Sequence, residues 1–218
     1  MIEGLTVGPI NERCYILPTE TAGLCILVDP GDEAERILAR IDARHERVAL
    51  VVATHGHLDH TAALPGLLHL LADRGPAPLI AVHRKDTAYF GPQAEDMNRR
   101  VFKAIRAVGF FNSYFEPMPA ATLLLEDGDT LPDSDWRVIH TPGHTAGSIC
   151  LYSEKHQALI SGDTLFRDGV GRTDGPDSDA QSLADSIERR LLALPDGTAV
   201  YPGHGDATSI GRERGYFP

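Results

Sequence analysis

The sequence predicts a mixed α/β (α+β) protein, since short apolar runs typical of strands alternate with segments in which apolar residues recur at helical spacing. The chain has 218 residues, of which 42% are hydrophobic and 23% charged, so it can bury a substantial core and is not expected to be disordered. We expect one domain over residues 1–218. The expected strands are 14–18, 24–28, 48–53, 79–82, 136–140, 148–153, 158–161 and 198–201, and the expected helices are 32–44, 61–74 and 180–194.

Local composition supports each of these elements. The strand runs are short, rich in aliphatic and β-branched residues, and bounded by turn residues such as glycine, proline and aspartate. In 32–44 the apolar residues share one helix face, with acidic residues in the first turn and arginines later, as the helix dipole favours. The segment 61–74 has a similar leucine-rich face.

One segment, 84–119, interrupts the alternation of strands and helices. It is compatible with helix and holds seven of the fourteen aromatic residues (one Trp, six Tyr and seven Phe in all): Tyr89, Phe90, Phe102, Phe110, Phe111, Tyr114 and Phe115. We interpret it as an aromatic-rich helical insertion. Two roles stay open, namely a small cap with its own apolar core, or a wall of a substrate pocket or oligomer interface.

Charge and cysteine content narrow the class of protein. The net charge is −11 and no basic run is present, so neither a nucleic acid nor an acidic membrane is an expected partner. Residues 1–10 lack the features of a secretion signal, and no apolar stretch is long enough to cross a bilayer. Cys14, Cys25 and Cys150 show no paired spacing, which indicates reduced thiols in a cytoplasmic protein.

The densest group of potential ligands follows the strand expected at 48–53. His55-Gly56-His57-Leu58-Asp59-His60 places four potential metal ligands in six residues. Imidazole and carboxylate ligands suit zinc, iron or manganese, and a rigid strand beside them can order them. A polar surface turn is the alternative interpretation.

Three further candidates stand where an expected strand passes into a turn. His144 follows 136–140 through Thr141-Pro142-Gly143, Asp163 follows 158–161, and His204 follows 198–201. Strand ends at one edge of packed sheets can converge in space, and a neighbouring glycine or proline permits the tight turn that directs the side chain inward. The repeated context favours one shared site over isolated structural histidines.

These segments resemble the motifs of the metallo-β-lactamase superfamily, over nearly the whole chain. The matching motifs are Thr54-His55-Gly56-His57-Leu58-Asp59-His60, Thr141-Pro142-Gly143-His144-Thr145, Ser161-Gly162-Asp163-Thr164-Leu165-Phe166, Gly169-Val170-Gly171-Arg172 and Pro202-Gly203-His204-Gly205. Within the superfamily the chain looks most like the hydroxyacylglutathione hydrolase (glyoxalase II) group, particularly its shorter members. The resemblance implies the metallo-β-lactamase fold, an αββα sandwich of two mixed β-sheets flanked by helices, with the metals at one edge.

The resemblance also implies a centre for two divalent metal ions, with zinc expected and iron or manganese as alternatives. His55, His57 and His144 would bind one metal, Asp59, His60 and His204 the other, and Asp163 would bridge them. Two such cations ionise a shared water at neutral pH, and Asp59 would take part in catalysis by orienting it. Asp29 matches a position that supports the ligands from outside, although a simple turn role is an alternative.

Three residues bear on the reaction and the substrate. His57 stands where flavo-diiron members, which react with oxygen or NO, have a carboxylate, so hydrolysis is favoured. Arg172 falls where the glyoxalase II pattern has a basic residue facing the substrate carboxylate, and a solvent-exposed loop arginine is the alternative. Unlike the longer members, the chain ends fourteen residues after His204, so their helical glutathione-binding region is expected to be missing, and Asp206 replaces a tyrosine of those enzymes.

We therefore predict a binuclear metallohydrolase that acts on a small, anionic acyl thioester such as S-lactoylglutathione. The alternatives within the superfamily are a persulfide dioxygenase with one iron and a lactonase or other ester hydrolase; a nuclease is disfavoured by the acidic charge. A non-catalytic protein that keeps the metals for stability or partner binding is the alternative from another class. The oligomeric state stays open.

Overall fold

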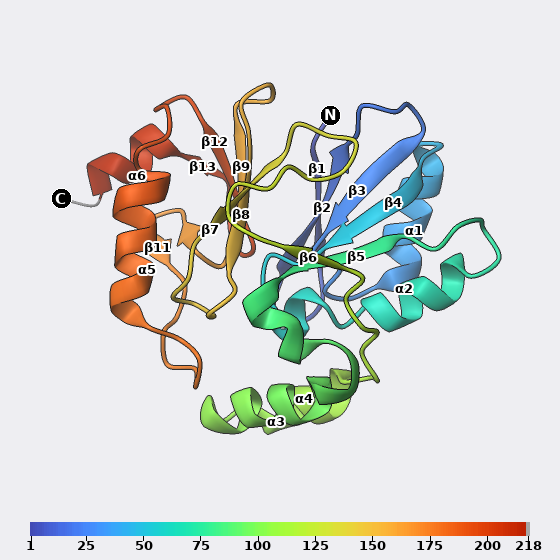
Figure 1. Cartoon of the computed structure of the whole chain (residues 1–218). Coiled ribbons are helices and arrows are strands. Elements are labelled where there is room, and N and C mark those ends of the chain that lie inside the picture. The colour runs from blue at the N-terminus through green and yellow to red at the C-terminus, as the bar shows by residue number, and fades with distance from the viewer. Residues whose placement is uncertain (217–218) are drawn as a thin grey trace.

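The computed structural model describes residues 1–216 and contains two β-sheets packed face to face, with helices on both outer sides (Figure 1). The first sheet has the strand order β1-β2-β3-β4-β5-β6 and the second β13-β12-β9-β8-β7. Both sheets are mixed: β3 to β6 are parallel and β1 to β3 antiparallel, while β9 and β12 form the parallel pair of the second sheet. The predicted αββα sandwich of two mixed sheets is confirmed.

The elements have the following bounds. The first sheet consists of β1 (Glu3–Val7), β2 (Glu12–Pro18), β3 (Leu24–Val28), β4 (Arg47–Val52), β5 (Leu79–His83) and β6 (Leu123–Leu125). The second consists of β7 (Arg137–His140), β8 (Ile149–Ser153), β9 (Ala158–Gly162), β12 (Ala199–Pro202) and β13 (Thr208–Ser209), and β10 (Leu165–Phe166) pairs with β11 (Gly169–Val170) as a separate ribbon. The helices are α1 (Ala34–Ala43), α2 (Leu64–Leu71), α3 (Ala94–Ala104), α4 (Val108–Tyr114), α5 (Ala180–Ser186) and α6 (Ile210–Tyr216), with short 3-10 turns at Leu58–His60, Arg84–Tyr89 and Gly91–Gln93.

All eight expected strands are present, each shifted by two residues or fewer at its ends. The expected helix 180–194 is shorter, because α5 ends at Ser186 and continues as a single π-helical stretch over Ile187–Leu191. The sequence analysis missed β1, β6, β10, β11, β13 and α6. Most of these strands are two or three residues long, too short for an alternating pattern to stand out.

The side-chain alternation of the strands builds separate layers of core. In β2, Cys14 and Ile16 join the cluster beneath α1 and α2, whereas Tyr15 and Leu17 point into the cluster between the two sheets. This follows from the two-residue period of a strand that is covered on both faces. A third cluster packs α5 against the outer face of the second sheet, with Leu183 as its central contact from that helix.

The aromatic-rich segment forms α3 and α4, which lie below the sandwich in Figure 1. Val101, Phe102 and Phe111 belong to the same hydrophobic cluster as the residues that pack α1 and α2 on the first sheet. The expectation that this segment has an apolar core of its own is therefore wrong. The buried side of the α3–α4 segment is an extension of the main core. This packing fixes the position of the side of the segment that faces away from the core.

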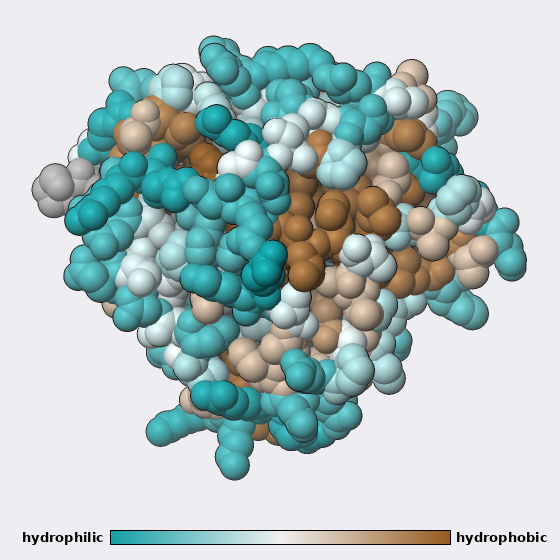
Figure 2. Space-filling view, in the orientation of Figure 1, coloured by the Kyte–Doolittle hydropathy of each residue, from teal (hydrophilic) through white to brown (hydrophobic). Residues whose placement is uncertain are grey.

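The surface seen in Figure 2 is mostly hydrophilic, with hydrophobic residues gathered near the middle of this face in the region of β5 and β6. Leu79 of β5 and Leu124 of β6 are each 44% exposed. Within residues 1–216, none of the helices combines the length and the apolar character needed to cross a bilayer. Cys14, Cys25 and Cys150 are buried, free thiols.

Candidate metal centre

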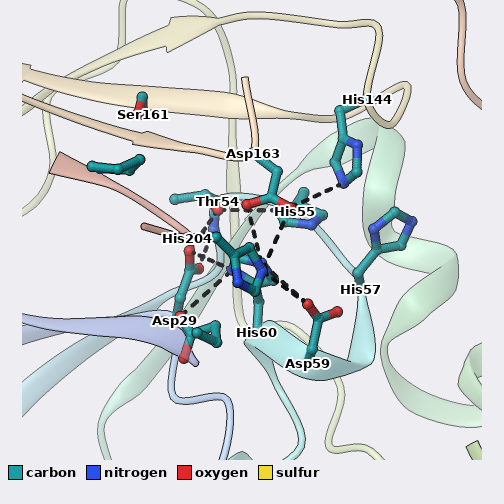
Figure 3. A network of polar contacts seen from close by, with 12 residues as sticks. Asp29, Thr54, His55, His57, Asp59, His60, His144, Ser161, Asp163 and His204 are labelled. Atoms are coloured by element: carbon teal, nitrogen blue, oxygen red, sulfur yellow. Dashed lines mark hydrogen bonds and ion pairs between the residues drawn. The ribbon is translucent and has the colours of Figure 1, made fainter. Parts of the chain in front are cut away.

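The carboxyl ends of four strands bring the predicted ligands to one edge of the sandwich (Figure 3). In the first sheet, β4 leads into the loop from His55 to His60. In the second sheet, β7 leads to His144, β9 to Asp163 and β12 to His204. The centre is thus built from both sheets, so its geometry depends on how they pack together.

All seven predicted ligands come together in overlapping groups whose ligand atoms lie within 4.8 Å of one another. The groups are His55, His57 and His144; Asp59, His60 and His204; and His55, His60 and Asp163. Asp163 lies between the first two groups. Its Oδ1 is 3.3 Å from Nε2 of His60, and its Oδ2 is 3.7 Å from Nε2 of both His144 and His204. One carboxylate therefore contacts both sets of histidines.

Most of the converging atoms lack hydrogen-bond partners within residues 1–216, the exception being the 3.2 Å contact between Nε2 of His204 and Oδ2 of Asp59. The atoms that are buried and have no hydrogen-bond partner are Nε2 of His55, His57, His60 and His144, together with Oδ1 of Asp163. Leaving such an atom unpaired costs about 1–3 kcal/mol, so a cluster of them is unusual in a folded protein. Imidazole nitrogens and carboxylate oxygens are ligands of divalent transition metals. The residues present therefore fit metal ions.

The opposite nitrogens of the same rings have defined partners. Asp29 Oδ2 lies 3.0 Å from Nδ1 of His60 and accepts a 2.6 Å hydrogen bond from Oγ1 of Thr54, which itself lies 3.1 Å from Nδ1 of His55. The backbone carbonyl of Arg172 lies 2.8 Å from Nδ1 of His144. A proton held on Nδ1 leaves the lone pair of Nε2 directed at the centre, which is the usual arrangement around metal-binding histidines.

Two glycines in the ligand motifs are required by close approach. A Cβ at Gly56 would overlap the ring of Tyr89, and a Cβ at Gly203 would overlap the carboxylate of Asp163. The backbone at these positions therefore passes closer to its neighbours than any other residue would allow. Gly56 thereby sets the spacing of His55 and His57, and Gly203 the position of His204.

Asp86 is a buried carboxyl group that the sequence analysis missed. Its oxygens accept hydrogen bonds from the backbone of Gly56 at 2.9 Å, the backbone of Gly147 at 2.7 Å and Oγ1 of Thr145 at 2.8 Å. It thereby connects the loop that carries His55 and His57 to the loop that carries His144. Burial raises the pKa of Asp86 to about 7, although these donors act in the opposite direction. Because it stands just after β5, the rule that found the other strand-end residues could have found it.

Glu12 is a second buried carboxyl group without a place in the sequence motifs. Its side chain is 1% exposed, and neither oxygen has a hydrogen-bond partner within residues 1–216. Oε1 lies 3.6 Å from Nδ1 of His60, on the side of the ring where Asp29 also lies. Burial raises the pKa of Glu12 well above its usual range. No pattern in the sequence would have marked this residue.

The electrostatics suit metal binding. Burial, followed by neighbouring imidazoles, lowers the pKa of His55 well below its usual range and that of His57 to about 3, so both rings are neutral at pH 7. Burial also opposes the charge on His60, but Asp163 and Asp59 outweigh it and raise the pKa of His60 well above its usual range. Without metal, His60 therefore carries a proton that a cation must displace.

The centre opens into a cavity of about 450 Å³, within the range of small-molecule sites. Phe102 and Phe110 of the α3–α4 segment line it together with residues of the metal centre. The aromatic segment thus forms a pocket wall, one of the roles left open by the sequence. Arg172 also lines the cavity, but its guanidinium donates two hydrogen bonds of 2.6 Å to the carboxylate of Asp174.

Comparisons with known proteins agree with this geometry. Residues 8–204 match the family model described as the metallo-beta-lactamase superfamily. Hydroxyacylglutathione hydrolase GloC of Haemophilus influenzae is 32% identical over 216 residues, which cover 98% of this chain and 94% of that protein. The crystal structure of the BLEG-1 B3 metallo-beta-lactamase has a TM-score of 0.84 at 29% identity and covers 100% of this chain and 98% of that one. TTHA1623 in a di-iron-bound form has a TM-score of 0.81 at 33% identity, with 99% and 98% covered.

Proposed function

The chain belongs to the metallo-β-lactamase superfamily, and on that premise we propose that it is a binuclear metallohydrolase of acyl thioesters. The observation that carries the proposal is the convergence of unpaired imidazole nitrogens from two sets of histidines on the carboxylate of Asp163. The likeness to a protein named hydroxyacylglutathione hydrolase supports a thioester, so S-lactoylglutathione is the first substrate to test. Zinc is the proposed ion; the di-iron form of TTHA1623 supports iron as the alternative, and manganese suits the same ligands.

The proposed ligand sets follow the observed groups. His55, His57 and His144 would hold one ion, Asp59, His60 and His204 the other, and Asp163 would contact both. When bound, two divalent ions lower the pKa of water and polarise a carbonyl group. Asp29 would keep the rings of His55 and His60 in the orientation that binding requires, through its contacts to Thr54 and Nδ1 of His60.

Asp59 is the residue proposed to act on the attacking water. One of its oxygens, Oδ2, lies 3.2 Å from Nε2 of His204, and the residue lines the cavity. In the protein without metal, burial opposes the charge on Asp59, but His60 and the other nearby histidines lower its pKa below the usual range. Bound cations would act in the same direction, so the carboxylate can accept a hydrogen bond from water and orient it. A thiolate is a good leaving group, so the reaction needs no separate acid to protonate it.

The test is thiol release by purified, metal-loaded protein. S-lactoylglutathione is compared with a lactone and with a β-lactam, the last because of the likeness to BLEG-1. We expect thiol release that stops on chelation, returns when metal is added, and is lost in Asp59→Asn. Hydrolysis of the lactone or the β-lactam without thiol release from any thioester would show that the proposed reaction is wrong.

Two alternatives give different results in the same samples. A persulfide dioxygenase would take up oxygen with glutathione persulfide and contain one iron per chain. A non-catalytic metal protein would lose thermal stability on chelation but turn over none of these substrates. We further propose a small-molecule substrate, a cytoplasmic location, and neither nucleic acid nor membrane as partner, in keeping with the net charge of −11.

A further inference from the structure

The cavity beside the metal centre has one polar wall and one apolar wall. The polar part of its lining includes proposed metal ligands, and the apolar part includes Ile10, Phe102, Ile105, Phe110 and Val170. These five side chains come from three separate parts of the chain: the turn before β2, the α3–α4 segment and β11. A substrate whose carbonyl group reaches the metals must therefore place another part against apolar side chains.

The aromatic part of this wall is held rigidly. The rings of Phe102 and Phe110 stack with centroids 5.5 Å apart and 8° between their planes, and Phe110 stacks in turn on Tyr114 at 4.4 Å. Phe102 is only 6% exposed and is anchored in the main hydrophobic cluster. The wall is preformed, so binding an apolar group to it requires little ordering of side chains.

Apart from the proposed metal ions, the described lining of the cavity offers an anionic substrate a single arginine, which is already paired. Among the described residues that line it, Arg172 is the one arginine or lysine, and both of its hydrogen bonds go to Asp174, which also lines the cavity. Glutathione carries two carboxylates at neutral pH. Both lie at the ends of the tripeptide, away from the thioester carbonyl group that the metals would polarise, so either would have to displace Asp174 from Arg172 or remain without a cationic side chain as partner in the cavity.

We propose that the substrate has an uncharged, apolar arm that lies against the α3–α4 wall, so that thioesters with such an arm are preferred over glutathione thioesters. This proposal rests on the proposed function and specifies its substrate class. The apolar arm can be the acyl group or the thiol group, and the two are separated by varying one while the other is kept constant.

The experiment measures kcat/KM of the metal-loaded protein on two series of thioesters. The acyl series runs from acetyl through butanoyl to hexanoyl on N-acetylcysteamine, an uncharged thiol, and the same acyl groups are tested on glutathione. The thiol series compares acetyl thioesters of N-acetylcysteamine and benzyl mercaptan. If the acyl group is the apolar arm, we expect kcat/KM to rise by about threefold per methylene of the acyl chain. If the thiol group is the arm, we expect kcat/KM to be higher for the benzyl mercaptan thioester than for the N-acetylcysteamine thioester. We also expect glutathione to be no better than N-acetylcysteamine.

A flat response in both series, or a preference of tenfold or more for glutathione thioesters, would overturn the proposal. Calorimetry with unreactive thioethers measures binding without hydrolysis, so it distinguishes failure of the apolar-arm proposal from failure of the proposed function. One outcome is that no thioester is hydrolysed but S-hexyl-N-acetylcysteamine binds more tightly than S-hexylglutathione. In that case the proposed thioester hydrolysis is wrong, and the preference for an apolar arm is supported. If neither thioether binds, or glutathione binds more tightly, the apolar arm is wrong.

Surface substitutions locate the effect in the cavity. Ile10 and Val170 are 47% and 40% exposed, so serine at either position is not expected to unfold the protein. Ile10→Ser and Val170→Ser should reduce the preference for the longer arm by about threefold each. Leu124→Ser, at a similarly exposed residue outside the cavity, is the matched control and should leave the preference unchanged. Asp174→Asn, which frees Arg172, should raise kcat/KM for S-lactoylglutathione relative to uncharged thioesters.

Discussion

Two groups of buried and partly buried histidines lie at strand ends in this molecule, and they differ in what their nitrogens face. In the metal centre, unpaired Nε2 atoms from both sheets converge on one another and on Asp163. His83, at the end of β5, and His140, at the end of β7, instead stack face to face with ring centroids 4.0 Å apart and 11° between the planes. Both groups contain histidines whose pKa burial lowers.

In the stacked pair, two nitrogens have partners that a metal ion would have to replace, and among the described residues no group of potential ligand atoms gathers around the unpaired Nε2 of His83. Nδ1 of His83 accepts a hydrogen bond from the backbone of Lys85, and Nε2 of His140 lies 3.0 Å from the carbonyl of Ala146. The carboxylate nearest to His83 is that of Glu126, 3.8 Å from Nε2 and about half exposed. Burial and a lowered pKa therefore do not mark a metal site. Convergence of unpaired donor atoms around a buried carboxylate does.

The largest expected effect is that of removing the shared carboxylate. Asp163→Asn should lower kcat/KM for thioester hydrolysis by about a thousandfold, because the amide carries no charge to hold two cations together. Metal content, measured by elemental analysis, should fall in the same variant. His140→Gln, in the stacked pair, should retain both metal and activity. Full metal content in Asp163→Asn would contradict the assigned role.

Metal removal should lower the thermal stability of the protein through the metal centre and not through the stacked pair. At metal concentrations a hundredfold above Kd, binding adds about 3 kcal/mol to the free energy of unfolding, which corresponds to a rise in Tm of roughly 5–10 °C for a chain of this size. We expect chelation to lower Tm by that amount and added metal to restore it. In His83→Gln the shift on chelation should be as large as in the natural protein. Equal melting temperatures with and without chelator would mean that no metal binds in this way.

Asp29 tests whether the outer contacts of the rings matter. Asp29→Asn keeps the size of the side chain but weakens acceptance of the proton on Nδ1 of His60, so metal affinity or activity should fall by about 10- to 100-fold. Glu126→Gln changes the carboxylate beside the stacked pair and is the matched control, with no expected change in metal affinity. If metal affinity and activity are unchanged in Asp29→Asn, Asp29 does not support the ligands and has only a turn role.

The smallest effect concerns acid stability and belongs to the stacked pair. Burial, followed by the neighbouring His140, lowers the pKa of His83 to about 4. Below pH 6.5 His83 is protonated in the unfolded chain, whereas in the folded chain it stays neutral until about pH 4. The free energy of unfolding therefore falls as the pH falls through this window. One such group contributes at most about 1.4 kcal/mol per pH unit.

Denaturant unfolding at pH 7 and pH 5 measures this contribution. His83→Gln should lose less stability over this interval than the natural protein, since the remaining histidines titrate in both. An identical loss in the two proteins would show that His83 does not resist protonation.

The parts of the centre that the sequence could predict are those with dense local spacing. The run from His55 to His60 and the recurring strand-turn-ligand pattern at His144, Asp163 and His204 locate all seven side chains that the structure brings together. The β-strands that carry them were also predictable as short aliphatic runs: β9 is buried throughout, and β4, β7 and β12 each combine buried with exposed or partly exposed positions.

What the sequence could not predict depends on contacts between distant segments. The role of Asp86 arises from its hydrogen bonds to two loops, and Glu12 is set apart only by being buried beside His60. The two roles considered for the aromatic segment could not be separated, because its rings both join the core and line the cavity. The pairing of Arg172 with Asp174 is local, yet a spacing of two residues does not predict which charges will pair.

The most direct test of the account is the metal stoichiometry of the purified protein and of two variants, measured by elemental analysis. The account predicts two divalent ions per chain in the natural protein, and loss of one ion in His144→Ala and of the other in His204→Ala, because these residues belong to different groups around Asp163. One ion or none in the natural protein, or a stoichiometry that neither substitution changes, would contradict a binuclear centre.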